Sequence, residues 1–321
     1  MLTLNQILMS TQAGLSSMLA VHYPKAVVCQ GQYILVPGDL PILLVAHLDT
    51  VHKTPVKHIC QSEDGLILMS PEGIGGDDRC GVYALVTLYD SAPKEGKPWL
   101  LFTCDEETGA HGAYQFSEDF FDGLLPPDIA RLKLLIELDR KGERDAVYYE
   151  CENPDLENYI TSKGFETAWG SFSDISVLAP DLGIAAVNLS VGYYNAHTQH
   201  EYIDRKHLNA TVKKVVEIVA DAAKPDFPQY EYIESYRFSR YGYGGWGDWG
   251  RGTYPLVLED APSLKKVTED IRDEYAALLD FYTEGELEAL RKEHGDNVIR
   301  MLFESELGDY YGDMYDEEEL K

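Results

Sequence analysis

The chain has 321 residues and a net charge of −28, from 55 acidic and 27 basic side chains. Its length allows one large domain or two smaller ones with a packed core, and its charge argues against nonspecific binding to nucleic acid. No apolar run approaches the roughly 18 residues that a membrane-spanning helix needs, and the N-terminus has no basic segment of an export signal. Five scattered cysteines without Cys-x-x-Cys spacing favour reduced thiols. We therefore expect a cytoplasmic protein that does not enter a membrane.

Taken in chain order, the sequence predicts an α/β fold with a mostly parallel mixed sheet flanked by helices. Residues 5–19 indicate a leading helix, and residues 26–36 a hairpin that feeds the sheet. Helical periodicity returns at residues 154–163 and 205–223. Between these elements, further apolar segments with the character of strands begin at Leu43, Trp99, Leu132 and Ala185.

Charged and metal-binding residue types follow several of these strands. His47 and Asp49 end the strand that begins at Leu43, and period-two geometry puts both on one side of it. The adjacent carboxylates Glu106 and Glu107 come just after the strand that begins at Trp99. One such carboxylate can hold a metal ion while the other moves protons. Since open α/β sheets build their sites at the carboxyl ends of their strands, we expect a metal site there.

Five motifs in this order resemble the co-catalytic di-zinc exopeptidases, a superfamily of aminopeptidases, carboxypeptidases, dipeptidases and deacylases. The resemblance covers roughly residues 40–220. The motifs are His-x-Asp-Thr from His47, Gly-Gly-Asp-Asp-Arg-x-Gly from Gly75, Asp-Glu-Glu-x-Gly-x-x-Gly from Asp105, Glu-Leu-Asp-Arg from Glu137 and His-Thr-x-x-Glu from His197.

The resemblance implies two divalent metal ions, with zinc expected first and cobalt or manganese as alternatives. It also implies a cis peptide bond after Asp77. Glu106 would be the general base, and Asp49 would orient His47. The implied metal ligands are His47 and Asp139 on one ion, Glu107 and His197 on the other, and Asp77 on both.

The implied activity is that of a metal-dependent exopeptidase acting on a peptide or small amide. Asp139 and His197 lie only 58 positions apart, which leaves no room for an inserted lid domain of about 50 residues or more. The catalytic part therefore resembles the compact branch without a lid, and this favours an aminopeptidase. A dipeptidase, a carboxypeptidase and an N-acyl amino-acid deacylase are the alternatives. A catalytically silent, peptidase-like binding protein is the alternative from another class.

Residues next to these motifs carry further expectations. His200 competes with His197 as a ligand, although the family pattern favours His197. Glu201 is expected to orient its loop or to hold a substrate terminus. His52 has no partner pattern, so we expect a surface or loop histidine. The remaining expectations are an Asp78–Arg79 ion pair, a substrate-side loop at Ser173–Asp174, substrate carboxylate binding by Arg79, Arg140 or Lys141, and substrate amine binding by Glu201 or Asp174.

A change of composition near residue 225 suggests three parts. Residues 1–225 are the predicted catalytic domain, and residues 226–257 an aromatic and glycine-rich linker or flap. Residues 258–321 are predicted to form a small acidic C-terminal helical extension, with helices over 263–279 and 284–302. The 96 residues from Asp226 onward carry 24 acidic and 10 basic side chains. A homo-oligomer, or a partner that binds this extension, is left open.

Overall fold

The computed structural model describes residues 2–170, 172–234, 275, 278, 284–296, 298–300 and 302. The chain divides into two units, Met1–Glu234 and Ser235–Lys321. All the predicted site residues belong to the first unit.

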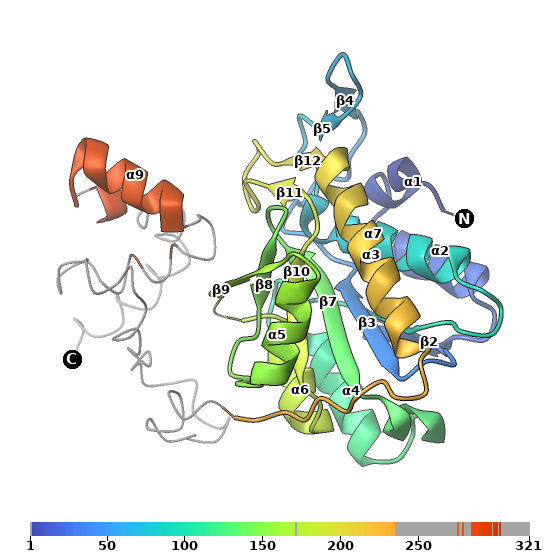
Figure 1. Ribbon diagram of the computed structural model, residues 1–321. Helices are drawn as coiled ribbons and strands as arrows, with labels where there is room; N and C mark the ends of the chain where they lie inside the picture. The colour runs from blue at the N-terminus through green and yellow to red at the C-terminus, as the bar shows by residue number, and fades with distance from the viewer. Residues whose placement is uncertain are drawn as a thin grey trace, which may run out of the picture. The chain divides into compact units, whose positions relative to one another are not determined.

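An eight-stranded sheet forms the centre of the first unit (Figure 1). Its strands are β1 (Val27–Cys29), β2 (Tyr33–Val36), β3 (Ile42–His47), β6 (Trp99–Thr103), β7 (Leu134–Arg140), β8 (Asp145–Val147), β9 (Glu166–Ala168) and β10 (Ala186–Ser190). The strand order is β1-β2-β6-β3-β7-β10-β8-β9. The pairs β3–β6, β3–β7, β7–β10 and β8–β9 are parallel, and the other three are antiparallel. The predicted mixed, mostly parallel sheet is confirmed.

Helices cover both faces of this sheet. One face packs against α3 (Gly76–Ser91) and α7 (Arg205–Ala222), and the other against α4 (His111–Phe121) and α6 (Asp174–Leu182). Successive residues of a strand face opposite layers, so Leu44 packs with the first pair of helices and Leu43 with the second. This explains why every residue of β3 and β6 is buried, since a sheet covered on both faces has no solvated side.

A second, four-stranded antiparallel sheet brings distant segments together. Its strands are β4 (Cys60–Gln61), β5 (Ile67–Met69), β11 (Tyr193–Tyr194) and β12 (Tyr202–Asp204), in the order β11-β12-β5-β4. The pairing of β5 with β12 joins a segment near residue 68 to one near residue 203. Strands of two or three residues are too short to show a period, so sequence patterns did not predict this sheet.

The single helix predicted over residues 5–19 is wrong, because the structure has two. These are α1 (Leu4–Leu8) and α2 (Gln12–His22). The hydroxyl oxygen of Thr11 accepts a hydrogen bond from the Gly14 amide and caps the start of α2. Such a cap fixes a helix start, since it satisfies an amide that has no intrahelical acceptor.

The remaining helices of the first unit are α5 (Pro154–Ser162) and the 3₁₀ helix η1 (Pro127–Arg131). Residues 226–234 pack against this unit, where Tyr230 accepts a backbone hydrogen bond from Ala185 and Ile233 accepts one from Glu152. In the second unit, α9 (Glu284–His294) lies within the predicted helix 284–302. The aromatic and glycine-rich run at 242–250 lies outside the described residues, as does the helix predicted over 263–279 apart from residues 275 and 278.

None of the helices in the described ranges combines the length and the apolar character needed to cross a membrane. All five cysteines are free thiols.

Candidate metal centre

Five predicted ligands converge at the edge where the parallel strands β3, β6 and β7 end. The sequence folds this way because each buried strand runs straight out of the apolar core into a polar turn. The positions are the last residue of β3 (His47), the turn that opens α3 (Asp77), the turn after β6 (Glu107), the end of β7 (Asp139) and the loop between β11 and β12 (His197).

The Asp77 carboxylate lies between the two histidines. Its Oδ1 is 3.1 Å from Nε2 of His47, and its Oδ2 is 3.3 Å from Nε2 of His197. Asp139 Oδ1 lies 3.5 Å from Nε2 of His47. Glu107 Oε2 lies 3.1 Å from Nε2 of His197. The arrangement therefore contains two donor groups that share one carboxylate, which is the pattern implied for two cations.

The donor chemistry fits divalent cations. Ligand atoms of His47, Asp77 and Glu107 all lie within 4.8 Å of one another. The buried Oε1 of Glu107 has no hydrogen-bond partner among the described residues. Imidazole nitrogens and carboxylate oxygens suit zinc, cobalt and manganese. Three buried carboxylates are costly without positive charge nearby, so cations would stabilise the cluster.

Asp78 forms part of a second possible donor group, with His47 and Asp139. Its oxygens already accept hydrogen bonds from the backbone amides of Gly81 at 2.8 Å and His47 at 3.3 Å. These bonds attach the start of α3 to the end of β3. The peptide bond between Asp77 and Asp78 is cis, as the resemblance implied.

Asp49 connects His47 to the turn that carries the two glutamates. Its Oδ1 lies 3.3 Å from His47 Nδ1 and accepts a hydrogen bond from the Glu106 amide at 3.1 Å. Its Oδ2 accepts one from the Glu107 amide at 3.0 Å. Burial would raise the pKa of Asp49, but the interaction with His47 and these amides lower it overall. Asp49 is therefore a charged acceptor that positions a ligand and the candidate base together.

Glu106 lies next to this cluster and carries a perturbed carboxyl group. Burial raises its pKa well above the ordinary value, and the charges of Asp139 and Asp174 raise it further, although His47 opposes them. Carboxyl groups with raised pKa values can accept and release protons near neutral pH.

The histidines and carboxylates of this cluster lie so close together that they shift several of one another's pKa values. Burial alone would lower the pKa of His47, but Asp139 and the other nearby carboxylates raise it well above its usual value. His197 is raised against burial by Asp77 and Glu107 in the same way. Burial raises the pKa of Asp139 to about 7, with the charge of Asp77 adding to the effect. The cluster thus concentrates negative charge in a buried place.

Glu201 holds the turn that carries Asp77. It is fully buried, and its carboxylate accepts hydrogen bonds from the amides of Gly75 at 2.8 Å and Asp77 at 2.9 Å. It also lies 2.8 Å from Nε2 of His52. Glu201 thus orients a loop, as one of its two expectations had it, but this loop is the Asp77 turn and not its own. His52 lies in a loop, as expected, and the fold brings its ring to Glu201, a contact that no sequence pattern indicated.

The predicted ion pair between Asp78 and Arg79 is also wrong. Asp78 points to backbone amides, and Arg79 donates to the carbonyl oxygen of Ile7 at 3.4 Å. Burial lowers the pKa of Arg79 to about 10, so the guanidinium stays charged at neutral pH. The two side chains leave the same turn towards different elements, β3 and α1.

Asp174, Ser173 and His200, which were also considered for the site, lie around the cluster. Asp174 is fully buried and accepts a hydrogen bond from the Thr103 hydroxyl. The Ser173 hydroxyl donates to Glu137 at 2.6 Å. His200 forms its hydrogen bonds through its backbone, whereas His197 reaches Asp77 and Glu107 with its ring.

No protein-family model and no curated protein sequence matches this chain. Solved structures do. A tripeptidase from Staphylococcus aureus is 15% identical with a TM-score of 0.51, over 69% of this chain and 97% of the tripeptidase. Aminopeptidase PepT from Bacillus cereus is 15% identical with a TM-score of 0.50, over 69% and 96% of the two chains.

A TET aminopeptidase from a marine sediment archaeon of the Thaumarchaeota is 11% identical with a TM-score of 0.51, over 64% of this chain and 91% of the other. At such low identity the similarity concerns the fold. About two thirds of this chain therefore has the fold shared by these structures, a tripeptidase and two aminopeptidases.

Proposed function

We propose that this protein is a metal-dependent exopeptidase that hydrolyses a peptide bond next to a chain terminus. The observation that carries the proposal is the position of Asp77, whose two carboxylate oxygens each face one histidine. Glu107 and Asp139 complete the two donor groups on either side. The names of the similar structures, a tripeptidase and aminopeptidases, support the same chemistry.

Divalent cations bound at such a site would polarise a scissile carbonyl and lower the pKa of a water molecule. We assign zinc first, with cobalt or manganese as alternatives. Asp49 would accept a hydrogen bond from Nδ1–H of His47, which keeps the proton on Nδ1 and leaves Nε2 free as a ligand atom. The assigned holders are His47 and Asp139 for one cation, Glu107 and His197 for the other, and Asp77 for both.

Glu106 is assigned the proton transfers. Its amide is fixed by Asp49, and its carboxyl group has a raised pKa through burial. It would take the proton of the attacking water and return it to the departing amine. Because its neighbour Glu107 ligates, the two adjacent carboxylates divide binding from proton transfer.

An aminopeptidase is the activity that we favour. A carboxypeptidase or an N-acyl amino-acid deacylase needs a cationic group for the substrate carboxylate. Arg140 donates to the carbonyl oxygen of Trp169 at 3.1 Å and lies 3.6 Å from Asp145, so it is engaged elsewhere. Arg79 points to α1. Lys141 is the remaining candidate for the alternative activities, which include a dipeptidase.

A panel of dipeptides tests the assignment. Purified protein reconstituted with zinc should bind two ions and cleave free-amine and C-amidated dipeptides, while N-acetylated ones resist. Cleavage of only the N-blocked members would replace the aminopeptidase by a deacylase. Binding of no metal after reconstitution would instead support a catalytically silent, peptidase-like binding protein.

A homo-oligomer is a separate proposal. The similar structure of PhTET1, 15% identical with a TM-score of 0.50, over 67% of this chain and 97% of the other, is described as a dodecamer. Light scattering on the full chain would give its mass in solution. A partner at the acidic C-terminal extension likewise stays a prediction.

A further inference from the structure

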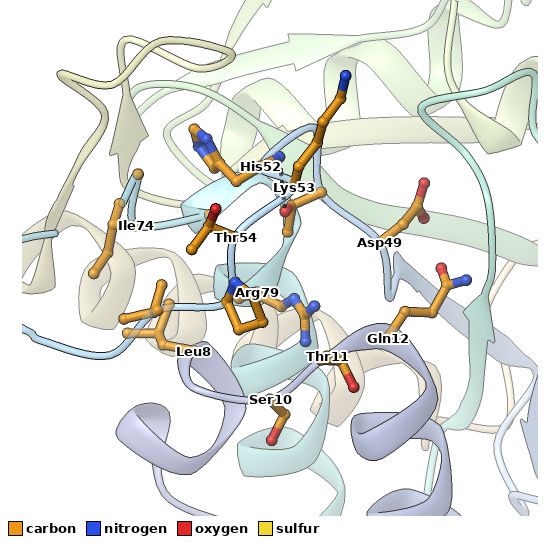
Figure 2. Close-up of a pocket in the computed structure, with 15 residues that line it drawn as sticks. Leu8, Ser10, Thr11, Gln12, Asp49, His52, Lys53, Thr54, Ile74 and Arg79 are labelled. Atoms are coloured by element: carbon orange, nitrogen blue, oxygen red, sulfur yellow. Dashed lines mark hydrogen bonds between the residues drawn. The ribbon is translucent and has the colours of Figure 1, made fainter. Parts of the chain in front are cut away.

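A polar pocket lies next to the metal centre, between helices α1 and α2 and the loop that follows β3 (Figure 2). Its volume is about 200 Å³, room for roughly six water molecules at about 30 Å³ each. Its walls include Asp49, His52 and Arg79, but none of the five assigned metal ligands and not Glu106. The pocket therefore adjoins the metal centre through Asp49, but the proposed ligands do not line it.

Arg79 brings a buried positive charge with unused hydrogen-bond donors to this pocket. Its side chain is only 4% exposed. Its one hydrogen bond goes from Nη1 to the Ile7 carbonyl at 3.4 Å, and its Nε has no partner within the described part of the chain. A guanidinium offers five N–H donors, and buried donors without acceptors are costly. Asp49 and Asp78 lie near enough to favour the charge of Arg79, but neither accepts a hydrogen bond from it within the described part of the chain. Arg79 therefore has donors available for a bound anion.

The carboxylates closest to Arg79 in sequence and space are occupied. Both oxygens of Asp49 face His47 and the amides of the 106–107 turn. Both oxygens of Asp78 accept hydrogen bonds from backbone amides. In the described ranges, neither forms an ion pair with Arg79.

The N-terminus of α2 faces the same pocket. Thr11, the capping residue, and Gln12, the first residue of the helix, both line it. The first amides of a helix have no intrahelical acceptors and carry partial positive charge, so they attract anions. Figure 2 shows the guanidinium of Arg79 directed towards these two residues. Lys53 also lines the pocket, but its ammonium extends away from Arg79 in this view.

We propose that this pocket is a binding site for a small oxyanion, a carboxylate or phosphate group held between Arg79 and the start of α2. The planar fork of a guanidinium matches two oxygens of either group. A bound anion would also touch Asp49 and His52, which support the turns that carry the candidate base and ligands. Asp49 holds Glu106 and Glu107, and His52 contacts Glu201, which holds the Asp77 turn. The site is therefore placed to influence the metal centre without entering it.

Calorimetric titration of the metal-loaded full chain with orthophosphate and, separately, with malonate tests this inference, at constant ionic strength set by sodium chloride. We expect saturable binding of at least one of them. The variant Arg79→Gln should bind it at least tenfold more weakly. Arg131→Gln removes the same charge from an 80% exposed position on η1 and should leave binding unchanged.

Phosphate can also bind to metal ions, so the signal of this site is the part of the isotherm that Arg79→Gln removes. A second variant, Thr54→Trp, places a large ring at an exposed position of the pocket wall and leaves Arg79 in place. It should cause the same loss, and it decides the matter if Arg79→Gln does not fold. Preference for phosphate or malonate identifies the group. Identical isotherms for the wild type and the folded pocket variants would overturn the proposal, as would no saturable binding of either anion.

Discussion

The two halves of the candidate metal centre are held by different kinds of structure. His47 and Asp139 lie on the buried strands β3 and β7, with side chains 1% and 9% exposed. Glu107 and His197 lie in turns outside the main sheet. His197 is 34% exposed, and its φ of 64° is in the left-handed region that non-glycine residues rarely adopt. We call these pairs the strand half and the loop half.

This difference predicts that two cations bound at the proposed centre would not be equivalent. Packing of the apolar core fixes the positions of the ligands in the strand half, so we expect these ligands to be ordered before a cation binds. The loop half depends on the hydrogen bond from the Glu107 amide to Asp49 and on the loop between β11 and β12. Ligands that are already ordered lose less entropy on binding. We therefore expect the strand half to hold its cation more tightly.

The largest expected effect comes from Glu106→Gln, which leaves both halves intact. Glutamine keeps the shape but cannot accept the proton, so turnover should fall by about two to four orders of magnitude. Metal content should stay at two ions, as measured by mass spectrometry. Glu118→Gln, an exposed glutamate on α4, is the matched control. Unchanged turnover in Glu106→Gln would remove this residue from the proposed chemistry.

A chelator should separate the halves. We expect the wild type to lose one ion at low chelator concentration and the second only at higher concentration. His197→Ala should retain only the tightly held ion, because it removes a ligand of the loop half. Its effect on the loop-half affinity should exceed the roughly 10- to 100-fold that loss of a supporting residue causes. His200→Ala, a neighbouring exposed histidine, should keep both ions. Loss of both wild-type ions in a single step would contradict the comparison.

Asp49→Asn should have a smaller effect that is spread over both halves. The asparagine amide would present a donor where the aspartate accepts from His47 and from the turn amides. We expect metal affinity and kcat/KM to fall by about 10- to 100-fold. Asp122→Asn, an exposed aspartate after α4, is the control. Unaltered metal affinity in Asp49→Asn would show that the backbone alone positions His47 and the turn with the two glutamates.

The strand half is also the part that the sequence predicts best. The apolar run before His47 and the mostly apolar run before Asp139 indicate strands buried on both faces, and such strands end at one edge of a parallel sheet. The order of the motifs along the chain therefore predicts that the residues of the candidate site lie at this edge, without knowledge of any tertiary contact.

Contacts between distant segments could not be predicted in this way. His52 and Glu201 are 149 positions apart, and they meet because short strands of the second sheet pair. Neither residue has a local pattern that points to the other. Arg79 stands in a helix-opening turn where a neighbouring aspartate suggests an ion pair, and only the fold shows that it faces a pocket with α1 and α2. Local patterns report which residues are buried, whereas tertiary packing decides which polar groups meet.

The smallest expected effect lies in the scaffold that supports both halves. Asp221 on α7 lies 2.5 Å from Lys163 Nζ and 2.6 Å from Lys224 Nζ. Hydrogen bonds from these ammonium groups lower its pKa to about 2. Because the folded pKa lies below the ordinary value near 4, this stabilisation is present above about pH 4 and is lost as the pH falls through about 2.

Asp221→Asn should therefore lower the unfolding free energy by about 1 kcal/mol at pH 7, and by progressively less as the pH falls from 4 towards 2. Thermal unfolding followed across this pH range measures the difference. Asp226→Asn, an exposed aspartate nearby, should change little at any pH. Both variants should keep two metal ions, since neither touches the centre. Loss of the tightly held ion in Asp221→Asn would mean that the strand half depends on α7, and its assignment as the preformed half would then fail.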